Sequence, residues 1–185
     1  MTRPHSLPVL SSKGLTLRPP LPTDIEARRV LGRVPDVMEE FGIHLGEAEP
    51  ISLAEAENWF DALVAQPMAW VIEHKGAMIG EILLHTLVPE DKRASMAIEI
   101  FDPLKLGKGI GPNAMHLLLG HAFENMGLHR VSGRVLADNT RAIVAYRKVG
   151  FLGEGRERQS TWLGNKWQDD VIMCVLRAEY VGPSG

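Results

Sequence analysis

Hydrophobic side chains recur at helical spacing in four parts of the chain. The pattern predicts helices over residues 24–34, 52–63, 112–126 and 139–149. The third has the clearest apolar stripe, because its hydrophobic side chains fall at i, i+3, i+4, i+7, i+8 and i+11 from Met115. Ser52 and Glu55 have the spacing of a capping box at the start of the second helix. Gly127 and Gly150 are suited to end the last two helices.

Outside these helices the hydrophobic pattern has a period of two, which predicts strands. The strands cover residues 15–18, 69–72, 78–84, 94–101, 129–136, 157–163 and 167–177. Compact turn sequences at residues 75–76 and 164–165 join two pairs of them as antiparallel hairpins. The order is strand, two helices, three strands, helix, strand, helix and two strands. It indicates an α+β fold in α/β/α layers, with one mixed, largely antiparallel sheet and helices on both faces.

Length and composition predict one domain over residues 14–180, with a flexible arm at 1–13 and a disordered tail at 181–185. The formal net charge of -3 gives no basic field for a nucleic-acid partner. No apolar run is long enough for a signal peptide or a membrane span, so we expect no membrane partner. Cys174 is the only cysteine, which excludes an internal disulfide and favours a cytoplasmic location.

A glycine-rich turn, Gly107-Lys108-Gly109-Ile110-Gly111, joins a predicted strand to the third helix. Glycines let successive backbone N–H groups converge on an anion, and the helix start adds its own unpaired N–H groups and its positive dipole end. Lysines within and just before the turn can add positive charge. The turn is therefore a candidate site for a pyrophosphate.

Taken alone, this turn leaves several interpretations open. It is not a P-loop, because the spacing and the hydroxyl residue after the lysine are absent. Gly109, Gly111 and Ala114 match a dinucleotide fingerprint, with Asp138 as a possible ribose partner. However, the turn follows an antiparallel meander rather than a series of parallel βαβ units. A CoA-type phosphate site, a dinucleotide site and an empty structural turn all remain open at this point.

A second motif follows about 30 residues after the turn and reads Asn-x-x-Ala-x-x-x-Tyr-x-Lys-x-Gly-Phe. Its members are Asn139, Ala142, Tyr146, Lys148, Gly150 and Phe151. With both motifs in this order, residues 94–177 resemble the GNAT superfamily of acetyl-CoA-dependent N-acetyltransferases. The branch it looks most like contains ribosomal-protein alanine and spermidine N-acetyltransferases. Some positions depart from the pattern: Leu106 stands where the family commonly has Gln or Arg, and Pro112 and Asn113 replace the Thr-Glu or Ser-Glu often seen next.

The resemblance implies a central sheet with a splayed strand pair, between which acetyl-CoA binds as co-substrate. It implies acetyl transfer to a primary amine of a small molecule or of a protein N-terminus. The implied cofactor-binding residues are Ile100, Phe101, Leu106, Gly107, Lys108, Gly109, Ile110, Gly111, Asn139, Ala142 and Lys148. Among these, backbone groups near Ile100 and Phe101 would pair with the pantetheine arm.

Two catalytic residues are implied. Tyr146 matches the family tyrosine that gives a proton to the CoA sulfur, and a phenol is protonated at neutral pH. Glu99 is our candidate for the base that removes the amine proton, with Glu81 on the neighbouring strand. A plain solvated strand position is the alternative for Glu99. The seven histidines are scattered, so we expect no metal site.

The acceptor pocket implied by the resemblance lies between the loop that joins the first two helices and the last two strands. Acidic and aromatic side chains occur there: Glu39, Glu40, Glu47, Glu49, Trp162, Trp167, Asp169 and Asp170. They favour a cationic amine as the acceptor. A non-catalytic acyl-CoA sensor and a dinucleotide-dependent oxidoreductase are the alternative functions. The resemblance also implies a possible homodimer, because dimers are common in the family.

Overall fold

The computed structural model describes residues 7–32 and 50–183. Within these ranges, eight strands form one sheet in the order β1-β2-β3-β4-β5-β6-β8-β7, with only the β5–β6 pair parallel. The strands are β1 (Leu10–Ser12), β2 (Leu15–Arg18), β3 (Ala69–His74), β4 (Ala77–Val88), β5 (Arg93–Ile100), β6 (Arg130–Leu136), β7 (Leu152–Trp162) and β8 (Trp167–Leu176). The helices are α1 (Asp24–Leu31), α3 (Leu53–Val64), α4 (Ile110–Gly120) and α5 (Thr140–Lys148), with short helical turns η1 (Pro103–Lys105) and η2 (His121–Asn125). The predicted α+β class with a mixed, largely antiparallel sheet is confirmed.

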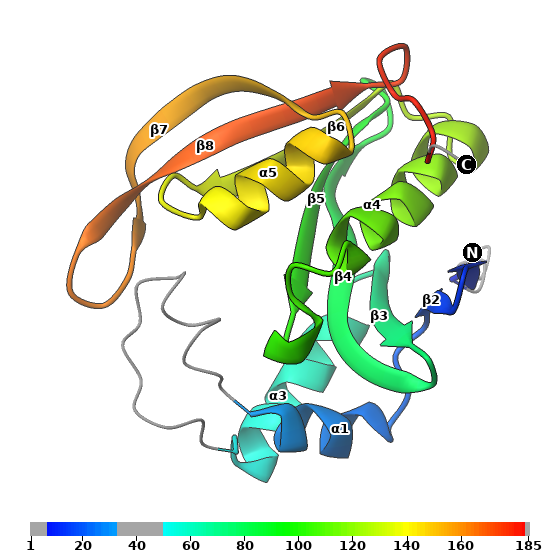
Figure 1. Cartoon of the computed structure of the whole chain (residues 1–185), viewed down its shortest axis with the longest axis vertical. Helices are drawn as coiled ribbons and strands as arrows, with labels where there is room; N and C mark the ends of the chain where they lie inside the picture. The colour runs from blue at the N-terminus through cyan, green and yellow to red at the C-terminus, as the bar shows by residue number, and fades with distance from the viewer. Residues whose placement is uncertain (1–6, 33–49, 184–185) are drawn as a thin grey trace.

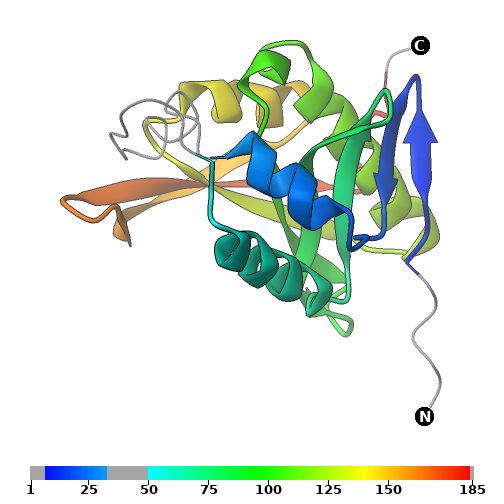
Figure 2. The same cartoon turned by 90° about the horizontal axis from the view of Figure 1, so that it is seen from below.

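Helices cover both faces of the sheet, which gives the expected α/β/α layers (Figures 1 and 2). On one face, α4 and α5 enclose the main core together with Trp70 and Ile72 of β3. On the other face, α1 and α3 cover a smaller cluster that includes Val71 and Phe101. Because β3 is buried on both faces, it reads as a continuous apolar run rather than an alternation.

Local sequence signals set several of the observed boundaries. The capping box is present, since the Glu55 backbone N–H donates to Ser52 Oγ at 3.2 Å and the Ser52 N–H donates to Glu55 Oε2 at 2.9 Å. A π turn extends α4, in which the Met126 N–H donates to the His121 carbonyl, and Gly127 ends it at φ +68°. The first helix is shorter than predicted, ending at Leu31.

Part of the segment predicted as a flexible arm, residues 1–13, forms a strand in the structure. Leu10–Ser12 form β1, which pairs antiparallel with β2. The Trp70 indole N–H also donates to the Pro8 carbonyl at 2.7 Å, which ties the segment to the core. Backbone pairing with β2 holds this strand in place. Its sequence, Leu-Ser-Ser, is too short and too polar to show the alternation that predicts a strand. Residues 1–6 and 184–185 lie outside the described residues.

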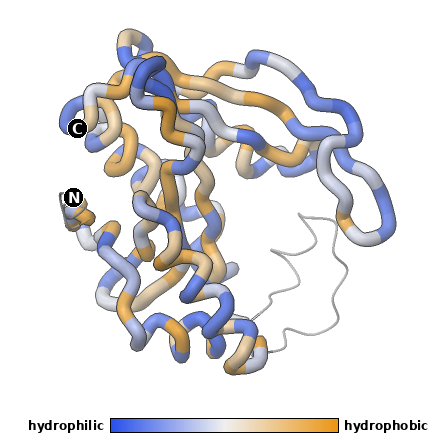
Figure 3. Tube along the Cα trace, turned by 180° about the vertical axis from the view of Figure 1, so that it is seen from behind, coloured by the Kyte–Doolittle hydropathy of each residue, from blue (hydrophilic) through white to orange (hydrophobic). Residues whose placement is uncertain are grey.

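The β7–β8 hairpin projects from the body of the sheet (Figures 1 and 2). Its outer strand β7 is exposed along most of its length and shows as a largely hydrophilic stretch in Figure 3. β7 begins at Leu152 rather than at residue 157, because Gly153 and Gly155 hide its start in the sequence pattern. No helix among the described residues has the length and apolarity needed to cross a membrane.

Candidate functional site

The central feature of the site is an opening in the sheet between β5 and β6. The two parallel strands pair only at their starts, over the three residue pairs from Arg93↔Arg130 to Ser95↔Ser132. Beyond Ser95, β5 stays paired with β4, while β6 continues along β8 as far as Leu136. In Figure 1 the strands β8 and β7 accordingly run away from β5. One edge of β5 is therefore left without a neighbouring strand over its second half.

A cavity of about 320 Å³ lies at this opening. Its wall comes from the end of β5, the glycine turn with the start of α4, and α5. The predicted site residues on this wall are Glu99, Ile100, Leu106, Gly107, Gly109, Ile110, Gly111, Asn139, Ala142, Tyr146 and Lys148. The fold thus brings together residues that the two motifs hold far apart in the chain.

Two of the predicted cofactor residues, Phe101 and Lys108, do not line the cavity. The Phe101 N–H donates to the Ile79 carbonyl of β4 at 2.8 Å, and its ring packs into the cluster under α1 and α3. Because backbone groups alternate in direction along a strand, those of Ile98 and Ile100 face the opening instead. The pairing expected near the end of β5 is therefore available from Ile100 and not from Phe101.

The glycine turn places backbone N–H groups at one end of the cavity. Gly107 and Gly109 have φ of +69° and +77°, values that favour glycine, and Gly109 is the N-cap of α4. The first N–H groups of a helix have no partner within the helix, and α4 has no acidic residue in its first turn. Pro112 stands in that turn, where its missing N–H breaks no helical hydrogen bond. This end of the cavity suits an anion.

Asn139 fixes the start of α5 beside the cavity. Its Oδ1 accepts a hydrogen bond from the Ala142 N–H at 2.9 Å, as an N-cap does, and the residue is 8% exposed. Thr140 and Arg141 also reach the cavity wall. Sequence reasoning misses these two residues, because they look like ordinary surface positions in the first turn of a helix.

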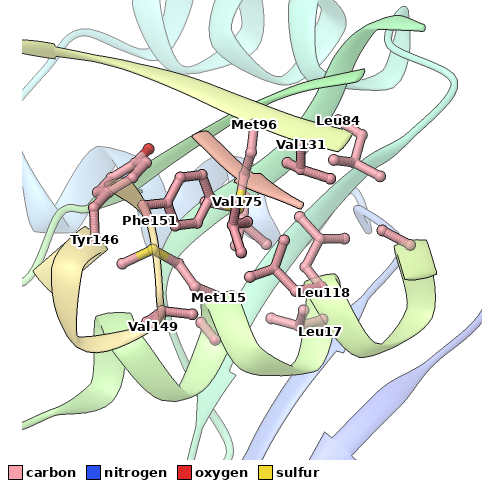
Figure 4. Packing of buried hydrophobic residues seen from close by; sticks show 14 of the residues in the cluster. Leu17, Leu84, Met96, Met115, Leu118, Val131, Tyr146, Val149, Phe151 and Val175 are labelled. Carbon is pink, nitrogen blue, oxygen red and sulfur yellow. The ribbon is translucent and has the colours of Figure 1, made fainter. Parts of the chain in front are cut away.

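Tyr146 lies at the edge of the main core with its ring against Phe151, at 4.8 Å between ring centroids (Figure 4). It is 4% exposed and lines the cavity. Burial raises the pKa of the Tyr146 phenol above its ordinary value. The hydroxyl therefore keeps its proton at neutral pH and can act as a donor toward the cavity.

Gly133 of β6 leaves the space that the Tyr146 ring occupies, since a Cβ there would overlap the ring. We expect Gly133→Ala to destabilise the fold by about 1–3 kcal/mol, as overpacking does, and to displace the tyrosine. Urea unfolding measures the loss. Gly153→Ala is the matched control, because a Cβ at Gly153 meets no atom within 4 Å. Equal effects of the two substitutions would contradict a specific fit between Gly133 and Tyr146.

Glu99 stands on the cavity wall directly opposite Glu81 of β4 in the antiparallel register. Burial, and then the charge of Glu81, raise the pKa of Glu99, whereas Arg28 opposes the rise. Burial also raises the pKa of Glu81, against a hydrogen bond from Trp59 and the charge of Arg28. A carboxyl with a raised pKa in a cavity wall is typical of a proton-transfer site.

The acidic side chains of the last two strands do not line this cavity. Asp169 accepts from Arg156 Nε at 2.6 Å, and Asp170 accepts from the Ser160 and Thr161 hydroxyls at 2.7 Å each. These bonds stabilise an irregular stretch within β7, where the register shifts between Glu157 and Thr161.

The expected acceptor pocket has only part of its predicted residues in the described structure. Trp162 and Trp167 pack on each other at 5.1 Å between ring centroids, about half exposed near the hairpin turn. Glu39, Glu40, Glu47 and Glu49 lie outside the described residues. Within the described ranges, no group of three or more His, Cys, Asp or Glu side chains is placed to hold a metal ion. The expected absence of a metal stays a prediction.

Comparison with known proteins identifies the fold around this cavity. A family model described as an acetyltransferase (GNAT) domain matches residues 14–152. The chain belongs to the GNAT acetyltransferase family. The resemblance expected from the two motifs is thereby confirmed.

Individual relatives of this GNAT chain are also named as N-acetyltransferases. Spermidine N(1)-acetyltransferase of Escherichia coli (strain K12) is 28% identical over 112 residues, which are 60% of each protein. The chain thus spans about three fifths of that relative's length. YoaA of Bacillus subtilis (strain 168), an uncharacterized N-acetyltransferase, is 28% identical over 174 residues, 92% of this chain and 97% of YoaA. The crystal structure of Vibrio cholerae spermidine N-acetyltransferase in complex with CoA and spermine shares the fold, with a TM-score of 0.72, 24% identity and coverage of 90% and 98%.

Proposed function

We propose that this chain transfers an acetyl group from acetyl-CoA to a primary amine of a small molecule or of a protein N-terminus. The observation that carries the proposal is the opening between β5 and β6, where one cavity wall joins the glycine turn, Tyr146 and Glu99. A dinucleotide-binding fold would need parallel βαβ units on both sides of the turn, whereas β5 belongs to an antiparallel meander.

Each part of acetyl-CoA has candidate binding groups on the cavity wall. The glycine turn and the start of α4 can hold the pyrophosphate, with Lys105, Arg141 and Lys148 as nearby cations on the wall. The free edge of β5 at Ile98 and Ile100 offers backbone groups to the amides of the pantetheine arm. A backbone N–H on this edge can also polarise the thioester carbonyl.

The chemistry then uses two side chains. The neutral amine attacks the thioester carbonyl carbon, a C–N bond forms, and the C–S bond breaks. Glu99 takes the proton that the amine loses, directly or through a water. The Tyr146 hydroxyl donates its proton to the sulfur as the C–S bond breaks, and CoA departs as the thiol. Proton exchange with solvent then returns Glu99 to the carboxylate and Tyr146 to the phenol.

The acceptor is a primary amine, and a carboxylate on the wall favours one that carries positive charge elsewhere. The names of the relatives make spermidine and spermine the first acceptors to assay. A buried single cysteine supports a cytoplasmic location. A homodimer, which the family resemblance implies, remains part of the proposal.

Ligand binding tests the cofactor assignment. We expect acetyl-CoA, and not NAD, to raise the melting temperature of the wild-type protein. Gly109→Ala should weaken acetyl-CoA about tenfold, or ~1.4 kcal/mol, because alanine is strained at φ +77° and the turn must relax. Gly14→Ala is the matched control, since Gly14 has φ +80° in the β1–β2 turn and open space around it. Stabilisation by NAD alone would overturn the assignment.

Turnover separates the enzyme from a non-catalytic acyl-CoA sensor. Release of free thiol, measured with acetyl-CoA and a panel of amines, should depend on the amine added. Tight acetyl-CoA binding with no thiol release from any amine would favour the sensor.

A further inference from the structure

A partly buried carboxylate pair lies at the cavity wall. Glu81 of β4 and Glu99 of β5 are opposite each other in the register, on the face of the sheet that α1 and α3 cover. Directly opposed residues of antiparallel strands have their Cβ atoms about 4.5–5.5 Å apart, and like charges at this distance repel. Only Glu99 of the two reaches the cavity.

The two carboxyls of the pair differ in their hydrogen bonding. The Trp59 indole N–H donates to Glu81 Oε2 at 2.5 Å, which favours the ionised form of that carboxyl. The Trp59 ring is itself held edge-on against Phe101, with 5.9 Å between centroids. No described side chain or backbone group donates a hydrogen bond to the Glu99 carboxylate. A single negative charge is therefore more stable on Glu81 than on Glu99.

Arg28 is the cation that packs against this region from α1. Its guanidinium lies over the Phe101 ring, 4.1 Å from the ring centre. Its positive charge lowers the pKa of both carboxyls, so it does not determine which of the two is ionised first. From the cavity side, the charged residues on the wall are Lys105, Arg141 and Lys148.

We propose that Glu81 is a positioning residue for acetyl transfer, whose anchored negative charge keeps Glu99 a strong base. The inference rests on the proposed function of Glu99 and adds a residue that touches neither substrate. A carboxylate of ordinary basicity is a weak general base, and efficiency improves as its pKa approaches the working pH. Trp59 supports this role by holding the charge on Glu81.

The direction of the pKa shifts agrees with this arrangement. The charge of Glu81 is the largest cause, after burial, of the raised pKa of Glu99. Glu81→Gln removes that charge and keeps an oxygen that can accept from Trp59. The pKa of Glu99 should then fall, so that Glu99 is ionised to lower pH but is a weaker base.

The pH profile of kcat/KM tests the proposal. In Glu81→Gln the acidic limb should move to lower pH, while the plateau at higher pH falls by a smaller factor than in Glu99→Gln. Trp59→Phe should move the limb in the same direction by less, because it removes the N–H donor that stabilises the Glu81 anion. Glu57→Gln, at an exposed position on α3, is the control for a lost negative charge and should leave the limb in place. An unmoved limb in Glu81→Gln, or a shift to higher pH, would overturn the proposal.

A titration without turnover keeps this inference separate from the proposed function. The ¹³C chemical shift of the Glu99 carboxyl, followed against pH in the protein without substrates, gives the midpoint of its titration directly. A lower midpoint in Glu81→Gln supports the coupling even if no amine is acetylated, in which case the proposed function fails alone. An unchanged midpoint in an active enzyme rejects the coupling and leaves the proposed function standing.

Discussion

Glu99→Gln is expected to lower kcat/KM for acetyl transfer by about 10²–10⁴-fold, the usual contribution of a general base, and to raise the melting temperature at neutral pH. The two effects have one cause. The same burial and the same Glu81 charge that make Glu99 a better base also make its ionised form costly in the folded protein. Glutamine keeps the shape and removes the charge.

The sign of the stability effect follows from linkage. The folded pKa of Glu99 lies above its ordinary value of 4.5, so the folded state binds this proton more tightly than the unfolded state does. Glu99 therefore stabilises the fold only at low pH, and that contribution is lost as the pH rises through the raised pKa. The melting temperature of the wild type should fall across this range above 4.5, and the slope should be shallower in Glu99→Gln.

Differential scanning calorimetry across this pH range checks the effect on the melting temperature. Amine-dependent thiol release, measured on the same samples, checks the effect on turnover. Glu57→Gln, at an exposed site, should change neither turnover nor the slope. A Glu99→Gln protein that is both inactive and less stable would show that the carboxylate holds the structure, and would remove it from the proton-transfer role.

The fold and the CoA side of the site follow largely from local signals. Alternation and helical spacing are visible in those elements that bury one face or one stripe, such as α4 and β4. The glycine turn and the motif from Asn139 to Phe151 lie on elements that follow parallel strands, so their meeting at one cavity could be expected. The length of the opening could not, because it depends on where β6 leaves β5 after Ser95.

The acceptor side shows what sequence cannot resolve. Asp169 and Asp170 read as free acids in the sequence, yet both bind groups of an irregular stretch in β7 that no local pattern predicts. The position of Glu81 opposite Glu99 likewise depends on the register of β4 against β5. The hydrogen bonds of a neighbouring strand and the shape of its loop set that register, and a shift of one residue would have placed the two carboxyls on opposite faces.

Tyr146→Phe should lower kcat by about 10²–10⁴-fold while acetyl-CoA binding and the fold survive. Only the hydroxyl is lost, because phenylalanine keeps the ring contact with Phe151 and the space beside Gly133. Since the pKa of the tyrosine is raised by burial, the wild-type profile should show no alkaline limb from this residue below pH of about 10. Rapid-quench measurement of the acetyl-transfer step, with a thermal shift for acetyl-CoA, gives both quantities.

The leaving group decides whether the hydroxyl acts on the sulfur. A thiol of lower pKa departs more readily without help, so an acetyl-thioester analogue of CoA with such a thiol should depend less on a donor. The deficit of Tyr146→Phe should therefore shrink with that analogue, whereas the deficit of Glu99→Gln should not, because Glu99 acts on the amine. An equal deficit of Tyr146→Phe with both thioesters would place the role of its hydroxyl elsewhere than at the departing sulfur.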